Sequence, residues 1–218
     1  MMDWHGLNTG GHILAGTLAL AVGLVPMFTR KGGALHRQAG YVTVALGLTV
    51  LGSAVIANIL FDPPAPLVAA TLSAGYQYLS GMRAAYLKAG PLKPVDIALA
   101  VCGLALCGLL WNNVAHGSAS WSPQIGYSTL GYILVILIYD LSRTFWMSVW
   151  HRHVRLLDHG LKMIGFYFAM LSAGAGNLLA QWQPLSQLLP SMIGLVVMIG
   201  FGVWYARHPI RHRALAAR

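Results

Sequence analysis

Seven long apolar stretches, separated by short polar connections, follow one another along the 218-residue chain. They cover about 12–28, 41–61, 66–87, 96–115, 124–141, 161–182 and 188–206. A helix needs about 20 mainly apolar residues to cross a bilayer, and these stretches are too long and too uniformly apolar for barrel strands. Backbone groups in lipid must also be paired internally. The pattern predicts an all-α fold: a polytopic, seven-transmembrane-helix bundle in which 1–218 is a single transmembrane domain.

The basic residues lie in every second connection. All 14 Lys and Arg residues fall within 30–37, 83–93, 143–162 and 207–218, whereas the N-terminus and the other connections have none. Membrane proteins keep Lys and Arg on the cytoplasmic side of their short loops. The alternation therefore predicts an odd number of spans, with the N-terminus outside and the C-terminus in the cytoplasm. We expect a multi-pass protein of the bacterial inner membrane.

Composition supports this class and excludes others. Apolar residues make up 57% of the chain and charged residues 9%, where a soluble domain has about 25% charged residues. The formal net charge of +9 could suggest nucleic acid. The basic residues, however, form short clusters between apolar stretches, with no zinc-finger spacing or RNP-like run. The expected partner is the lipid bilayer, with no nucleic acid.

The connection before the sixth stretch differs from the others. Phe145, Trp146 and Trp150 recur at helical spacing, and Arg152 and Arg155 can occupy the opposite side. This pattern predicts an amphipathic interfacial segment at about 143–157, lying in the inner headgroup region.

Two histidines stand at matching depths near the cytoplasmic side. His36 is at the start of the second stretch, and His159 is at the start of the sixth. Facing imidazoles can bind haem iron axially or contribute to a metal site. The sequence therefore offers His36 and His159 as ligands of haem b or a transition metal, with Arg37 or Arg83 balancing the cofactor charge.

A second histidine pair lies near the opposite face. His12 and His116 could form another cofactor-binding pair there, and two sites at opposite faces would suit electron transfer across the membrane. The alternative for all four histidines is an interfacial imidazole that hydrogen-bonds to headgroups, water or helix ends.

Polar residues form a stripe on the third apolar stretch. Ser73, Tyr76, Gln77, Ser80 and Arg83 follow one another at spacings that place them on one helix face. Polar residues inside spans usually face the bundle interior. Tyr76, Gln77 and Ser80 could line a substrate pocket or a proton path, and Arg83 could hold a cofactor propionate. The alternative is hydrogen bonding between helices.

The acidic residues are few, and their positions suggest partners. The chain has five aspartates and no glutamate. Asp96 begins a predicted helix, where a carboxylate caps free N–H groups. Asp140 ends one, where the helix dipole disfavours it, so we expect it to pair with Arg143 or with a basic residue across the bundle. Asp158 can pair with Lys162 at helical spacing.

Several short motifs resemble those of a family of bacterial membrane proteins defined by a domain of unknown function. The motifs are His12-x3-Gly16, Lys31-Gly32, His36-Arg37-x2-Gly40, Ser80-Gly81-x-Arg83 and His159-x3-Met163 followed by Asn177. The resemblance covers about 12–180. It implies a multi-helix inner-membrane protein with His36, Arg37 and His159 as candidate site residues, and it implies no reaction. The paired histidines give a looser similarity to b-type cytochrome and ferric-reductase-like bundles.

Three functions follow from these observations. The first is a redox or metal-dependent membrane protein that uses His36 and His159. The second is a binding or transport protein for a small or lipid-like molecule, which the polar stripe suggests. The third is an accessory subunit that packs against other membrane subunits or forms a homo-oligomer. No HExxH, GxSxG, P-loop or CxxC motif is present to assign an enzyme class.

Overall fold

The computed structural model describes residues 3–86, 92–116, 122–147 and 152–208. These residues form seven α-helices and two short 3-10 helices, and they include no strand. The elements are α1 (Trp4–Phe28), α2 (Ala34–Leu60), α3 (Ala65–Tyr86), α4 (Pro94–Asn113), η1 (Val114–His116), α5 (Pro123–Trp146), α6 (Arg152–Leu178), η2 (Ala180–Trp182) and α7 (Leu185–Arg207). The all-α fold predicted from the sequence is confirmed.

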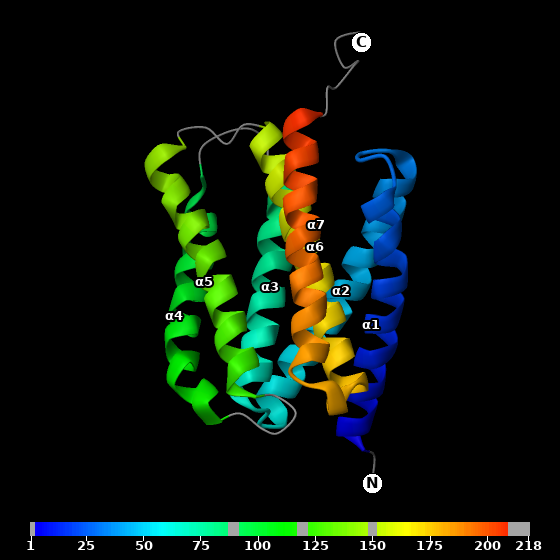
Figure 1. The fold of residues 1–218 in the computed structure, drawn as a ribbon, viewed down its shortest axis with the longest axis vertical. Helices are drawn as coiled ribbons and strands as arrows, with labels where there is room; N and C mark the ends of the chain where they lie inside the picture. Colours follow the sequence, from blue (N-terminus) through cyan, green and yellow to red (C-terminus); the bar gives the residue numbers. More distant parts are fainter. Residues whose placement is uncertain (1–2, 87–91, 117–121, 148–151, 209–218) are drawn as a thin grey trace.

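Successive helices run in opposite directions, so the bundle has an up-and-down arrangement (Figure 1). The N-terminus lies at one end and the C-terminal end of α7 lies at the other. The ends of the helices beside the predicted basic connections lie at the C-terminal end of the bundle. We call this the basic end, and the opposite end the neutral end.

Five helices are long and apolar enough to cross a membrane: α1, α2, α4, α5 and α7. The other two, α3 and α6, are more polar and lie at the centre of the bundle. Helix α3 packs against α2, α4, α5 and α6, while α6 packs against α1, α3 and α7. A helix that its neighbours shield from lipid can carry polar side chains. Polarity in α3 and α6 therefore reflects their central position.

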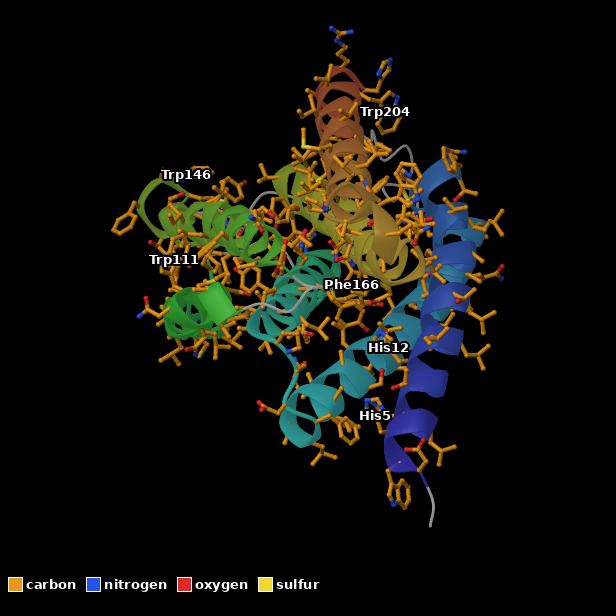
Figure 2. All side chains as sticks on the ribbon, turned by 60° about the horizontal axis from the view of Figure 1, so that its bottom comes forward. His5, His12, Trp111, Trp146, Phe166 and Trp204 are labelled. Carbon is orange, nitrogen blue, oxygen red and sulfur yellow. The ribbon has the colours of Figure 1, made fainter. Side chains whose placement is uncertain are left out.

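Tryptophans lie near both ends of the bundle. Trp4, Trp111 and Trp182 are exposed near the neutral end, and Trp146 and Trp204 are exposed near the basic end. Figure 2 shows Trp111, Trp146 and Trp204 on the outside of the bundle. Tryptophan is enriched where the headgroups of a bilayer meet its hydrocarbon core. The two groups are compatible with aromatic belts at the two surfaces of a membrane.

Helix α1 extends beyond the predicted apolar stretch. It begins at Trp4, because the carboxylate of Asp3 accepts a hydrogen bond from the backbone N–H of Gly6, at 3.0 Å. An aspartate at this position satisfies one of the free N–H groups of the first turn. The polar residues before His12 are therefore helical.

The predicted interfacial segment is divided between two helices. Helix α5 continues to Trp146 and α6 begins at Arg152, while residues 148–151 lie outside the described residues. Phe145 and Trp146 are exposed, as a lipid-facing side would be. In contrast, Arg143 and Arg155 are buried. The part of the segment that α6 contains packs in the bundle at Arg155, whose side chain lies inside it.

Candidate functional site

Four charged side chains meet inside the bundle near its basic end. Asp140 and Arg143 come from α5, and Asp158 and Lys162 come from α6; we call these four the ion cluster. Arg143 lies 2.8 Å from Asp140 and 3.2 Å from Asp158. Lys162 lies 2.7 Å from Asp140 and 3.0 Å from Asp158. Each cation therefore contacts both carboxylates, and the formal charges balance.

The ion cluster is closed to solvent, since its side chains are only 3–4% exposed. Burying a charge costs several kcal/mol unless a partner and further hydrogen bonds compensate it. Tyr76 of α3 supplies such a bond, because its hydroxyl donates to Asp140 at 2.5 Å. The predicted pairs within each helix are present, and the structure adds the pairs that join α5 to α6.

A second group of polar side chains surrounds Gln77, the residue after Tyr76 in α3. The Nε2 of Gln77 donates to the carbonyl and the hydroxyl oxygens of Ser73, at 3.1 and 3.3 Å. Its Oε1 accepts from the hydroxyl of Tyr132 in α5, at 2.8 Å. Gln77 is fully buried. The amide therefore fixes the positions of Ser73 and Tyr132 relative to each other.

Close approach of α3 and α6 encloses Gln77. A Cβ atom at Gly165 of α6 would collide with Oε1 of Gln77 and would lie 2.7 Å from the hydroxyl oxygen of Tyr132. At Gly81 of α3, a Cβ atom would lie 3.0 Å from the Cβ of Lys162. Small residues allow helices in membranes to pack backbone against backbone. Glycine at these two positions lets α6 cover the polar stripe.

The predicted stripe residues have separate partners. Tyr76 contacts the ion cluster, and Gln77 bonds to Tyr132. Ser80 donates to the carbonyl of Tyr76 within its own helix, at 2.7 Å. Arg83 pairs with Asp96 at 2.6 Å and so ties the end of α3 to the start of α4. The prediction that the stripe faces the bundle interior agrees with this arrangement.

A cavity of about 190 Å³ lies beside Gln77, between α3, α5, α6 and α7. Its polar lining consists of Ser73, Ser128, Thr129, Tyr132, Ser172 and Ser191. The remaining lining residues are apolar or glycine, among them Phe168, Ala169, Leu188, Met192, Leu195 and Met198. The cavity therefore combines hydroxyl groups with an apolar wall and contains no charged side chain.

The cavity has a side that faces the outside of the bundle. Helices α3 and α6 pack against each other behind it, α5 packs on α3, and α7 packs on α6. Figure 1 shows α3 between α5 and α7. On these two flanking helices, Ser128 and Met192 line the cavity and are exposed. The exposed part of the cavity lining therefore includes residues of α5 and α7.

The two histidines near the basic end both bond to backbone carbonyls. A carbonyl only accepts, so Nδ1 of His36 donates to Pro26 at 3.1 Å and Nδ1 of His159 donates to Gly81 at 2.9 Å. This tautomer leaves Nε2 of each ring with a lone pair. His36 lies within electrostatic range of both His159 and Lys31. The structure thus brings this predicted pair to one region of the bundle.

Lys31 lies in the connection beside this pair. Its ammonium group donates to the carbonyls of Pro26 and Met27, at 2.8 and 2.6 Å, and so caps the C-terminal end of α1. Burial lowers the pKa of Lys31. Arg37 lies one turn into α2 and is exposed. His36 bonds to the same Pro26 carbonyl that Lys31 caps, so this contact of His36 belongs to the end of α1. Among the described residues, no contact of Arg37 indicates a bound ligand.

The other predicted pair is not brought together. His12 lies on α1, where its Nδ1 is 2.8 Å from the hydroxyl of Ser53 in α2. Figure 2 shows His12 on the side of α1 that faces α2. His116 ends η1, which packs against α3, α4 and α5 on the opposite side of the bundle, and its side chain lies outside the described residues. The helix order separates the two positions.

Within the described residues, no group of three or more His, Cys, Asp or Glu side chains is arranged to hold a metal ion. That finding concerns sites with three or more protein ligands. A haem or metal bound through His36 and His159 would use two, so it stays a prediction.

Sequence reasoning missed the cavity residues on α5, α6 and α7. Tyr132, Ser172 and Ser191 are hydroxyl-bearing residues in apolar stretches, and such residues often bond only within their own helix. Ser128 and Tyr132 are four residues apart, which places them on one helix face. That spacing was the available signal, but the sequence does not show which helix faces it.

Comparisons of the chain with protein-family models, with curated proteins and with solved structures gave no match. The fold itself defines an all-α bundle with five helices capable of crossing a membrane.

Proposed function

We propose that this chain is a bacterial inner-membrane protein with seven spanning helices, its N-terminus outside and its C-terminus in the cytoplasm. The clustering of basic residues toward one end of the bundle supports this orientation. The central position of α3 and α6 supports seven spans rather than five, since helices enclosed by others need less apolar surface.

Its proposed activity is to bind a small or lipid-like molecule in the cavity between α3, α5, α6 and α7. The observation that carries this proposal is a cavity with hydroxyl groups on one side and apolar walls on the other. Ligand sites are typically concave and mainly apolar, with a few placed polar groups. The cavity reaches Tyr132, beyond which Gln77 and Tyr76 continue toward the ion cluster. If the protein also transports the bound molecule, we expect the path to follow this row of polar side chains.

Filling the cavity tests this activity. We expect Ala169→Phe to place a phenyl ring in the cavity, and Met192→Trp to obstruct its exposed side. Native mass spectrometry of protein released from membranes should show a bound lipophilic molecule in the wild type and less of it in both variants. Ala105→Phe is the matched control, because Ala105 is exposed on α4, away from the cavity.

The fold of each variant is checked by its melting temperature in detergent. Equal ligand occupancy in the wild type, the two cavity variants and the control would contradict the proposal, and so would a wild type with no ligand. Met192→Trp keeps the test informative if Ala169→Phe does not fold, because Met192 is 58% exposed.

A second proposal is that His36 and His159 bind haem b or a transition metal. The fixed Nδ1 bonds, which leave both Nε2 atoms as acceptors, favour it. An optical spectrum of the oxidised and dithionite-reduced protein, with metal analysis, tests this proposal. We expect a Soret band or stoichiometric metal that His36→Ala and His159→Ala remove. A flat spectrum without metal, after expression with adequate haem, would contradict it.

A further inference from the structure

The cavity lining restricts the charge of its ligand. None of the lining side chains carries a formal charge. The nearest charged groups along α5 and α6 are those of the ion cluster, in which each cation contacts both carboxylates. An ion placed in an apolar site without a partner costs much more free energy than a neutral polar group. The cavity therefore disfavours carboxylate, phosphate and ammonium head groups.

Hydrogen bonds around Gln77 orient two hydroxyl groups at the inner end of the cavity. Tyr132 donates its single hydroxyl hydrogen to Gln77, so its oxygen can accept another bond. Ser73 accepts from Gln77, and within the part of the chain that the structure describes its hydroxyl donates no hydrogen bond, so its hydrogen can bond to a ligand. The inner end thus presents one acceptor and one donor. A ligand hydroxyl, which both donates and accepts, matches this pair.

Size and access restrict the rest of the ligand. The cavity of about 190 Å³ exceeds the roughly 150 Å³ of an engineered protein cavity that holds benzene. A head group of the size of one ring therefore fits. Phe168, Leu188 and Leu195 make the walls apolar, and the exposed side lies between α5 and α7. Tyr132 is nine residues into α5, about 14 Å along the helix, so a tail leaving the cavity would meet lipid hydrocarbon.

Resting on the function proposed above, we infer that the ligand is a neutral amphiphilic alcohol, with its hydroxyl between Ser73 and Tyr132 and its apolar chain in the bilayer. Gln77 is a positioning residue in this site, because it orients both hydroxyls. Entry is lateral, from the bilayer between α5 and α7. A fatty acid anion or an alkylamine of equal chain length is rejected.

Photoreactive probes of matched length test the charge preference. The full-length protein in lipid nanodiscs is exposed to diazirine-bearing dodecanol, dodecanoate or dodecylamine, and labelled peptides are identified by mass spectrometry. We expect the alcohol to label the cavity faces of α5 and α7 several times more than either ion. Excess unlabelled dodecanol should suppress that labelling, and Ala169→Phe should remove it.

Ser73→Ala tests the hydroxyl contact, and Ser80→Ala is its matched control. Both serines are buried in α3, but Ser80 donates to its own helix and does not line the cavity. Loss of one neutral hydrogen bond should weaken dodecanol binding about twofold to tenfold in Ser73→Ala, with no change in Ser80→Ala. Equal binding by both variants would overturn the assignment of the hydroxyl to Ser73.

The outcomes separate the two proposals. Stronger cavity labelling by dodecanoate or dodecylamine would leave ligand binding in place and overturn the neutral-alcohol inference. Absence of cavity labelling by all three probes, or labelling that Ala169→Phe leaves unchanged, would overturn the proposed binding function together with the inference.

Discussion

At the residue scale, the ion cluster is the most demanding feature of the molecule. Its two carboxylates and two cations lie inside a bundle whose described helices are mostly apolar. Each charge is tolerated because the opposite charges lie within 3.2 Å. The sequence predicted Asp158–Lys162 from their helical spacing, and it predicted that Asp140 pairs with Arg143 or with a basic residue across the bundle, because the helix dipole disfavours Asp140. The bonds that cross between α5 and α6 depend on tertiary packing.

Removing one cation should destabilise the fold. Lys162→Met leaves two buried carboxylates with a single cation, and breaking a buried pair typically costs about 3–5 kcal/mol. We expect this loss in the free energy of unfolding, measured by denaturation in detergent. Lys93→Met is the control, because Lys93 is exposed before α4.

Restoring neutrality should recover much of that loss. The double variant Asp158→Asn with Lys162→Met removes one charge of each sign, and Arg143 remains opposite Asp140. We expect the double variant to be more stable than Lys162→Met alone when unfolding is measured in the same detergent. A double variant as unstable as the sum of the two single variants would refute charge balance as the reason for the cluster.

At the element scale, the contact between α3 and α6 builds the site. Polar residues of α3 face α6, and Gly165 leaves the space that Gln77 fills. The sequence predicted that Tyr76, Gln77 and Ser80 share one face, since their spacing is helical. It could not predict Tyr132 as the partner of Gln77, because hydrogen bonds between helices depend on which helices are neighbours.

The sign of the stability change caused by glycine-to-alanine substitution tests the close contact between α3 and α6. Gly165→Ala should destabilise the protein by about 1–3 kcal/mol, because the added methyl group overpacks the position next to Gln77. Gly131→Ala, in α5, has no atom within 4 Å of its new Cβ and should be neutral or stabilise by up to about 1 kcal/mol. Thermal unfolding of both variants in one detergent makes the comparison, and effects of equal sign would count against the close approach.

At the scale of the whole molecule, charge distinguishes the two ends of the bundle. Basic residues gather toward one end, and tryptophans lie toward both. The positive-inside rule supports the proposed orientation, in which the basic end lies in the cytoplasm.

Cysteine labelling at the two ends of α4 tests the orientation. In a background with Cys102→Ala and Cys107→Ala, Asn113→Cys marks the neutral end and Lys93→Cys marks the basic end. A membrane-impermeant thiol reagent should label Asn113→Cys in cells with a permeabilised outer membrane, and Lys93→Cys only after the inner membrane is opened. The reverse pattern would invert the proposed topology.

The sequence by itself determined the helical class, the approximate extent of the helices and the side of α3 that is polar. These properties are periodic or compositional, so they can be derived from neighbours along the chain. Only the tertiary structure decided that Lys162 reaches Asp140, that Tyr132 meets Gln77 and that His12 lies away from the position of His116. The cavity also belongs to this second group. In a membrane, helices lack a hydrophobic force that selects their neighbours, so adjacency depends on small residues, polar contacts and shape in three dimensions.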